Sequence, residues 1–344
     1  PFSLVIIETT TFDKLMNTEI DKKQKFNMSQ FQNLPDEIIL KVLGHLKVKD
    51  LLSCGQLSKR IRAISHDKSL YQKIDLAGKK VQTIFLETIV NKGCKILTLS
   101  GAQLEGSDLN LNEESQLRCL NLDFCAASVT NLEILTSSCV KLQKISMRRL
   151  SKLFLSSNMI KNICCQNGQT LQVLNLENCI KDGRSLSPDQ VQLITEKCVH
   201  LKELNFNSTG LFFGGVGILT KNLTPTVQKV SLRNCPLVED RDIGVLVKRC
   251  NQICFLDLED TGITSNCIPE IIKNLKGSLE ELNVQSQHFY HTPHEKSAEL
   301  FGLKFLRRFK ILHVIVCAFM EKRLRYHLPG IEINNKEIDG YFCC

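Results

Sequence analysis

Sixteen cysteines are the most reactive side chains of this 344-residue chain, and cysteines can form disulfides or bind a metal. Six of them fall at two recurring positions of a repeated motif, with Cys125, Cys179 and Cys235 at one position and Cys139, Cys198 and Cys250 at the other. Equivalent positions of a repeat array lie in parallel rows, each cysteine within its own repeat. The chain also has no paired C-x-x-C clusters. We therefore expect buried, reduced thiols and no metal site.

Other residue types that carry catalysis do not form a recognisable arrangement. Gly214–Gly217 has the composition of a phosphate-binding loop, but its spacing matches neither G-x-G-x-x-G nor G-x-x-x-x-G-K-[ST], and we expect it to begin a helix. His288, His291 and His294 cluster in an expected loop, where solvated side chains are a better interpretation than metal ligands. No H-E-x-x-H, G-x-S-x-G or kinase motif is present. We therefore predict no catalytic residues and no cofactor, and a protein that is not an enzyme.

A motif of the form L-x-x-L-x-L-x-x-C positions the first row of cysteines. It occurs at Leu117–Cys125 and Leu171–Cys179, and with valine at two positions at Val227–Cys235. Softer or degenerate copies continue the series, and the middle apolar residues of the copies are Leu97, Leu120, Ile145, Leu174, Leu204, Val230, Leu256, Leu282 and Phe309. This motif at this spacing is the signature of leucine-rich repeats.

The physics of one repeat predicts the shape of the array. The two leucines of L-x-L point to one side of a short strand and need cover from the repeat's own helix and its neighbours, so no repeat is stable alone. Strands stack about 4.8 Å apart, whereas packed helices need about 8–10 Å, so the array must curve with its strands on the inside. We predict an α/β fold in which residues 77–334 form a curved solenoid of about nine to ten repeats with a parallel inner sheet.

Local signals place several elements within this frame. Capping-box patterns at Thr130–Glu133 and Ser187–Gln190 predict helices at about 130–139 and 188–198. Near the C-terminus, residues 319–334 are expected to form one more helix and a short strand. Outside the folded parts we expect a mobile arm at 1–30 and a tail at 335–344.

Residues 31–76 have the periodicity of short helices rather than repeats. Pro35 can open the first helix, with Asp36 in the first turn where the helix dipole favours a negative charge. Asp50 and Ser58 are expected to cap the second and third helices. Three short helices build only a small core, so we expect apolar surface to remain for a partner.

Several short sequences in this segment together resemble an F-box over residues 31–73: L-P-D-E-I-I from Leu34, L-L from Leu51, S-K-R from Ser58 and S-L-Y-Q from Ser69. Ile61 and Tyr71 stand where F-boxes commonly have tryptophan, and both can still pack. The run Ser69–Lys79 is also similar to the corresponding segment of the S-phase kinase-associated receptors. The resemblance implies an F-box protein with leucine-rich repeats, which is a non-catalytic substrate-recognition subunit of an SCF-type ubiquitin ligase.

The resemblance also implies partners. The F-box would dock an SCF adaptor, and a cullin scaffold through it, while the solenoid binds a protein substrate for ubiquitination and proteasomal degradation. The S-phase likeness implies a phosphorylated cell-cycle regulator as substrate, a small cyclin-kinase-subunit accessory protein, and residence in the nucleus and cytoplasm. The residues that would meet the adaptor are Leu34, Pro35, Ile38, Ile39, Val42, Leu51 and Leu52. The alternative is that most of them form the F-box's own core.

On the solenoid, residues that flank the strand leucines should face the concave side. The candidate substrate-binding residues are Asn121, Asp123, Arg148, Glu177, Asn207, Arg233 and Glu259. Arg148 and Arg233 can bind a phosphate on a substrate, but the favoured alternative is that they pair with Glu177 and Glu259 on adjacent strands. The pattern indicates a binding surface and does not identify its ligand.

The net charge of +8 at pH 7 is unevenly distributed. Between residues 304 and 325 the only acidic residue is Glu321, whereas the basic residues are Lys304, Arg307, Arg308, Lys310, Lys322, Arg323 and Arg325. This basic end suits an acidic or phosphorylated partner, although a solvated cap is the interpretation we favour. No aromatic-interleaved basic patch indicates nucleic-acid binding, and no apolar run reaches the ~20 residues of a membrane span. The rival function is a repeat scaffold or inhibitor whose F-box-like segment is only an N-terminal cap.

Overall fold

The structure is a computed structural model that describes residues 31, 33–111, 113–150, 155–179, 186–286 and 296–335. The chain divides into two compact units, Pro1–Tyr71 and Gln72–Cys344. The predicted arm at 1–30 lies outside the described residues, as does the predicted tail after Asn335. The division after Tyr71 places residues 72–76, which the sequence assigns to the F-box segment, with the repeats.

The described part of the N-terminal unit contains the short helices α3 (Asp36–Leu43), α4 (Val48–Cys54) and α5 (Lys59–Ser65) and the 3₁₀ helix η1 (Lys68–Tyr71). Helix α5 begins where predicted because the Ser58 hydroxyl accepts a hydrogen bond of 3.1 Å from the Ile61 amide. The prediction that Asp50 caps α4 is wrong, since Asp50 lies within the first turn of that helix. Its carboxylate still favours the positive end of the helix dipole there.

Apolar side chains from every helix fill the interior of this unit. The buried ones include Phe31, Ile39, Leu43, Leu51, Ile61, Ile64 and Tyr71. The Tyr71 hydroxyl donates a hydrogen bond of 2.9 Å to the Ser65 carbonyl, which satisfies the one polar atom of this buried ring. Ile61 and Tyr71 therefore pack in the places where F-boxes commonly have tryptophan.

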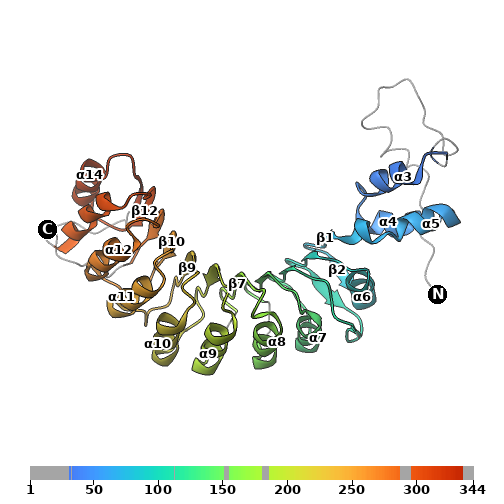
Figure 1. The fold of residues 1–344 in the computed structure, drawn as a ribbon, viewed down its shortest axis with the longest axis horizontal. Helices are drawn as coiled ribbons and strands as arrows, with labels where there is room; N and C mark the ends of the chain where they lie inside the picture. Colours follow the sequence, from blue (N-terminus) through green and yellow to red (C-terminus); the bar gives the residue numbers. More distant parts are fainter. Residues whose placement is uncertain are drawn as a thin grey trace, which may run out of the picture. The chain divides into compact units, whose positions relative to one another are not determined.

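The second unit is built on one parallel sheet of eleven short strands in chain order (Figure 1). The strands are β1 (Lys73–Asp75), β3 (Ile96–Thr98), β5 (Cys119–Asn121), β6 (Lys144–Ser146), β7 (Val173–Asn175), β8 (Glu203–Asn205), β9 (Lys229–Ser231), β10 (Phe255–Asp257), β11 (Glu281–Asn283), β12 (Ile311–Val314) and β13 (Glu332–Asn335). A separate pair, β2 (Lys80–Gln82) and β4 (Gln103–Glu105), forms a two-stranded sheet. The predicted curved solenoid with a parallel inner sheet is confirmed.

Register in the large sheet brings the middle apolar residue of each strand next to the equivalent residue of the next strand. Leu97 pairs with Leu120 and Leu256 with Leu282, as the repeat pattern predicts. The ninth marker, Phe309, is wrong because Leu282 pairs with Leu312, three residues further along. The sheet also extends by one strand at each end, around Ile74 and Ile333, which the repeat motif alone did not mark.

Helices cover the outer side of the sheet in Figure 1. They are α6 (Thr83–Asn91), α7 (Val129–Ser138), α8 (Ser157–Asn167), α9 (Pro188–Lys197), α10 (Phe213–Asn222), α11 (Asp240–Arg249), η2 (Ser265–Cys267), α12 (Ile268–Leu275), η3 (Lys296–Phe305) and α14 (Ala318–His327). The helix and strand expected at 319–334 are present as α14 and β13. Gly214–Gly217 lies inside α10, which confirms the helical interpretation of these glycines.

The two predicted capping boxes have different outcomes. The Ser187 hydroxyl accepts from the Gln190 amide and the Gln190 side chain accepts from the Ser187 amide, so the capping box of α9 is confirmed. The box at Thr130 is wrong, because Ser128 caps α7 by accepting a hydrogen bond of 3.1 Å from the Asn131 amide. Both serine and threonine can cap a helix, and the extended backbone that a cap requires occurs here two residues earlier.

Cysteines of the two predicted rows are buried and reduced. Several thiols donate to carbonyl groups of the preceding repeat, as Cys179 does to Met147 and Cys235 to Phe206. The rows are not wholly separate, since the Cys198 thiol hydrogen-bonds Cys164 of the neighbouring repeat and, together with burial, raises the pKa of Cys164. No group of three or more possible metal ligands occurs among the described residues.

Burial raises the pKa of the Cys139 and Cys250 thiols to about 11. An unfolded thiol ionises near pH 9, so the unfolded state gains negative charge before the folded state does. This contribution to stability is fully present below pH 9 and is lost as the pH rises towards 11, at ~1.4 kcal/mol per pH unit for each thiol. We expect the urea midpoint to fall over this range, and to fall less steeply in the variant C139A/C250A. Equal slopes for the two proteins would contradict this account.

Candidate protein-binding surfaces

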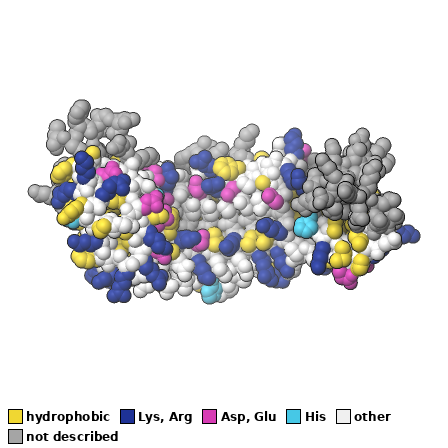
Figure 2. All heavy atoms as spheres, turned by 90° about the horizontal axis from the view of Figure 1, so that it is seen from above, with side chains coloured by type: hydrophobic (Ala, Val, Ile, Leu, Met, Phe, Trp, Pro, Cys, Tyr) yellow, Lys and Arg dark blue, Asp and Glu magenta, His cyan; other side chains and the backbone are white. Residues whose placement is uncertain are grey.

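The concave side of the sheet is the candidate substrate surface, and Figure 2 looks onto it. Basic, acidic and hydrophobic side chains are interspersed along this side (Figure 2). The predicted residues are exposed to very different degrees: Arg233 is exposed, Asn121, Arg148 and Glu177 are half-buried, and Asp123, Asn207 and Glu259 are buried. The seven positions therefore do not form one equally available surface.

A recurrent turn explains part of this burial. In most repeats, an asparagine or aspartate ends the strand, and its side-chain oxygen accepts a hydrogen bond of 2.8–3.1 Å from the amide two residues later. The accepting residues are Asp75, Asn121, Asn175, Asn205, Asp257 and Asn283. Such side chains satisfy backbone groups that would otherwise be unpaired in the turn. Asn121 is therefore part of the scaffold as well as of the face.

Two repeats have serine in place of this asparagine, and the preceding repeat supplies the missing acceptor. Asp123 Oδ1 accepts from the Arg148 amide at 2.9 Å and from the Ser146 hydroxyl. Asn207 Oδ1 does the same for the next such repeat, accepting from the Arg233 amide at 2.8 Å and from the Ser231 hydroxyl. Asp123 and Asn207, which the sequence predicts as substrate-binding residues, are thus committed to holding neighbouring turns.

The charged candidates pair with one another. Arg233 Nη2 lies 3.0 Å from Glu259 Oε1, so the pairing favoured from the sequence is confirmed there. Arg148 lies between two carboxylates, 3.8 Å from Asp123 and 4.0 Å from Glu177. The side chains of Arg148 and Arg233 are each more than two fifths exposed, so their guanidinium groups remain available to a further acceptor. Glu259 is buried beneath its partner and does not form part of the accessible surface.

The structure adds Phe124 and Arg149 to this face, two residues that the sequence reasoning missed. Both are in the left-handed region at the position after the turn, with φ of 56° and 48°, where Gly78 and Gly101 stand in the first repeats. Phe124 is 42% exposed, and the guanidinium groups of Arg148 and Arg149 lie 5.3 and 6.0 Å from its ring centre. A bulky residue is strained in this conformation, and an exposed aromatic side chain stacked by cations is a common binding contact.

In the N-terminal unit, the predicted adaptor-contact residues separate into two groups. Pro35 and Ile38 are exposed, and Leu34 and Val42 are half-buried. Ile39 and Leu51 are fully buried in the core of the unit, which removes them from the contact surface and agrees with the alternative interpretation. The side chain of Leu52 lies outside the described part of the chain.

A basic side chain of α5 holds the start of α3 in place. Arg60 Nε donates to Asp36 Oδ1 at 2.8 Å, and Arg60 Nη2 donates to the Leu34 carbonyl at 2.7 Å. These bonds fix the Leu34–Asp36 segment against α5, so that Pro35 and Ile38 are presented on a defined backbone. An exposed apolar group on a fixed backbone is suited to docking because little conformational entropy is lost on binding.

The parts of the chain that carry these two surfaces each match a known family. Residues 31–77 match the F-box-like domain, and residues 84–340 match the SKP2 LRR domain. The second match alone spans more than half of the chain. The chain belongs to the SKP2-type family of F-box proteins with leucine-rich repeats. Members with these two domains are typically non-catalytic receptor subunits that bind an SKP1-like adaptor within a cullin-based complex.

Solved structures match the chain at low sequence identity. The yeast Rad7 and Elc1 complex has a chain that matches at 14% identity, covering 96% of this chain and 98% of that chain with a TM-score of 0.39. The leucine-rich-repeat protein LegL7 from Legionella pneumophila matches at 14% identity, covering 80% of this chain and 88% of that chain with a TM-score of 0.41. No described helix of this family member has the length and apolar character that crossing a membrane requires.

Two substitutions of Asp123 distinguish the role of its negative charge from its role as a hydrogen-bond acceptor. We expect Asp123→Ala to lower the free energy of unfolding by about 1–3 kcal/mol, because it leaves the Arg148 amide without its acceptor. Asp123→Asn should remain within about 1 kcal/mol of the wild type, because Asn207 performs the same role in the equivalent turn. Urea unfolding of the three proteins measures the difference. Equal destabilisation by both substitutions would show that the charge is what the turn requires.

Proposed function

We propose that this protein is the substrate-recognition subunit of an SCF-type E3 ubiquitin ligase. The observation that carries the proposal is the combination, in one chain, of an F-box-like domain with an SKP2-type repeat domain. The N-terminal unit docks the adaptor, and the concave face of the repeats binds a protein substrate. The proposed site of action is the nucleus and cytoplasm.

Adaptor docking uses the exposed end of α3. Pro35 and Ile38 form its accessible centre, with the half-buried Leu34 and Val42 beside them. Ile39 and Leu51 act from beneath by fixing the backbone that presents this surface. An interface of this kind is expected to bury on the order of 1,200–2,000 Å².

The repeats bind the substrate through exposed side chains that the scaffold does not fully use. Phe124 supplies an aromatic anchor, and Arg148, Arg149 and Arg233 supply positive charge around it and further along the face. A phosphorylated segment of a cell-cycle regulator suits this chemistry because arginine binds phosphate with two parallel hydrogen bonds. A small cyclin-kinase-subunit protein is proposed as an accessory partner on the same side of the repeats.

Catalysis in such an assembly depends on proximity. The receptor holds an acceptor lysine of the substrate near a ubiquitin-conjugating enzyme, so that transfer occurs at an effective concentration in the mM range. No catalytic side chain of the receptor is needed for this step. A repeat scaffold or inhibitor without a ligase role is the second candidate, and adaptor binding distinguishes the two.

Ile38→Asp tests adaptor docking. Ile38 is 40% exposed, so the substitution should leave the fold intact while placing a charge in the apolar interface. We expect an SKP1-like adaptor to bind the wild type and to bind the variant at least about tenfold more weakly in a titration by isothermal calorimetry. The matched control is Ile84→Asp, which alters a 65% exposed isoleucine on α6 and should not change binding. A wild-type chain that does not bind the adaptor would favour the scaffold function.

Phe124→Asn tests substrate binding on the concave face. Asparagine tolerates the left-handed backbone better than phenylalanine, so we expect the free energy of unfolding, measured in urea, to stay within about 1 kcal/mol of the wild type or to rise. Loss of the aromatic anchor should at the same time reduce the set of proteins recovered with the chain. Quantitative mass spectrometry of proteins bound to the Ile38→Asp background, with and without Phe124→Asn, measures that set.

Phe212→Asn is the matched control for this experiment. Phe212 is 55% exposed just before α10, away from the strands, and its replacement should leave the bound set unchanged. If Phe124→Asn lowers stability sharply, or leaves every bound protein in place, Phe124 is not an anchor for substrate.

A further inference from the structure

The turns that lead into the strands of the large sheet carry a strong excess of positive charge. Nine of these turns, at 92–95, 116–119, 139–144, 167–172, 197–203, 221–229, 248–254, 276–281 and 306–310, contain three acidic residues, Glu203, Glu280 and Glu281. Their basic residues are Lys92, Lys95, Arg118, Lys141, Lys144, Lys197, Lys202, Lys221, Lys229, Lys248, Arg249, Lys276, Arg307, Arg308 and Lys310. This edge of the array, here called the basic edge, therefore carries more positive charge than the chain's whole excess of +8. Basic side chains gather along one long rim in Figure 2.

Helix dipoles explain only part of this charge. A cation in the last turn of a helix is favoured by the dipole, which accounts for residues such as Lys197 and Lys221. Lys95 and Lys202 instead directly precede strands, and each lies beyond the last turn of the helix before it, which ends at Asn91 or Lys197. The ion pairs between described residues neutralise Lys229 and Lys310 on this edge but do not include Lys202, Lys221 or Lys248. Like charges without ion-pair partners repel one another, and an acidic partner on this edge would relieve that repulsion.

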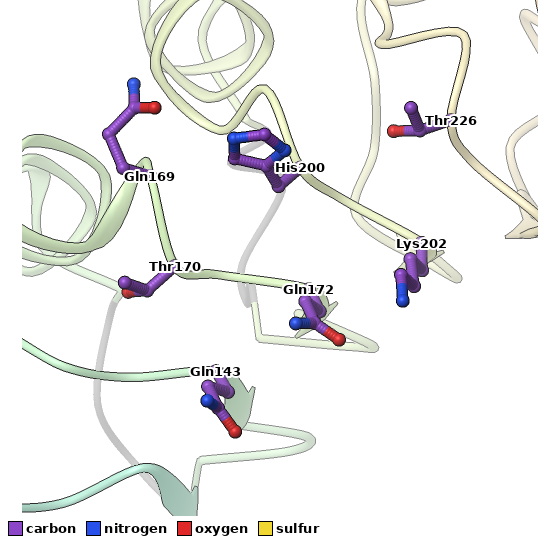
Figure 3. Close-up of a pocket in the computed structure, with 7 residues that line it drawn as sticks. All are labelled: Gln143, Gln169, Thr170, Gln172, His200, Lys202 and Thr226. Atoms are coloured by element: carbon purple, nitrogen blue, oxygen red, sulfur yellow. The ribbon is translucent and has the colours of Figure 1, made fainter.

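A hollow of about 430 Å³ lies on the basic edge beside the starts of β6, β7 and β8. Gln143, Gln172 and Lys202 each directly precede one of these strands and line it (Figure 3). The remaining lining residues are Gln169, Thr170, His200 and Thr226 (Figure 3). Amide and hydroxyl groups both donate and accept hydrogen bonds, so this hollow is suited to the backbone and carboxylates of an extended peptide.

A second hollow of about 550 Å³ adjoins the first. Its lining residues are Lys221, Pro225, Val245, Lys248 and Arg249, and Pro225 is the chain neighbour of Thr226 in the first hollow. Val245 is 39% exposed and, with Pro225, provides apolar lining in the same hollow as Lys221 and Lys248. Arg249 is already engaged, since its Nε donates to the Leu223 carbonyl at 2.6 Å.

We propose that the basic edge docks an extended acidic segment of a partner polypeptide. Its carboxylates contact Lys202, Lys221 and Lys248, and one apolar side chain packs against Pro225 and Val245. Single-stranded nucleic acid fits less well, because such sites stack bases on exposed aromatic rings and neither hollow is lined by Phe, Tyr or Trp. The surface differs from the adaptor-docking and concave surfaces, and the inference does not rest on ligase function.

The test is binding of the full-length chain to a fluorescein-labelled peptide of Asp and Glu residues around one Leu, followed by fluorescence anisotropy. The wild type should bind, with an affinity that falls as salt is raised from about 50 mM to about 200 mM. The variant K202E/K221E/K248E should bind at least about tenfold more weakly. Its matched control is K41E/K59E/K161E, which removes the same net charge from exposed lysines outside these turns and should retain binding.

Thermal unfolding of both triple variants shows whether either has lost its fold. The proposal is overturned if the peptide does not bind the wild type, or if the two triple variants lose affinity equally. It is also overturned if single-stranded or duplex nucleic acid binds the wild type more tightly than the peptide at the same salt concentration, because the partner would then be of another class. These readings require no adaptor, so they are independent of the outcome of the adaptor titration.

Discussion

The turn that follows each strand is the constraint on which the repeat array depends. From Gly78 to Asp260, a residue in the left-handed region donates its amide to a carbonyl of the next repeat at 2.7–3.0 Å. Without these bonds a donor and an acceptor would lose their partners in every repeat, and one such hydrogen bond contributes about 0.5–1.5 kcal/mol. The bonds also fix the register between neighbouring repeats, because each one joins the same two positions. Regular stacking of the strands is therefore a consequence of the turn as much as of the leucines.

This constraint divides the concave face into residues that maintain the turn and residues that are free to bind. Asp123 and Asn207 replace a missing acceptor in the following repeat, so their polarity serves the fold even though they lie on the binding side. Phe124 does the opposite: it occupies a position suited to glycine, at a cost in backbone strain that no contact within its own turn requires. A residue that is unfavourable for the fold and exposed on a binding face is better explained by recognition than by stability. Exposure and strain together thus identify binding residues that polarity alone does not.

The sequence predicted most of the fold because the repeat motif encodes the buried side chains directly. Spacing of the leucines fixed the register, and the serine at 187 fixed the start of α9. Prediction from the sequence failed where the deciding interaction is not local. Phe309 and Leu312 both have apolar neighbours at the spacing of the motif, but the strand begins after Lys310 because its backbone pairs with that of β11. The site was predicted less well for the same reason: whether Asp123 is a ligand or a scaffold residue depends on Ser146, a residue of the next repeat.

The two units also differ in how far they satisfy themselves, and this difference bears on function. Each internal repeat buries its leucines against neighbours on both sides, so the array needs no partner for its core. In its described residues the N-terminal unit has three short helices and a 3₁₀ turn, and it leaves Ile38 and Leu57 exposed around that small core. An apolar surface of this kind weakens a small unit in water, yet Arg60 holds the adjoining segment in a fixed conformation instead of letting it collapse over the exposed groups. The unit is therefore arranged to bind through this surface, and its stability within an assembly comes partly from whatever covers it.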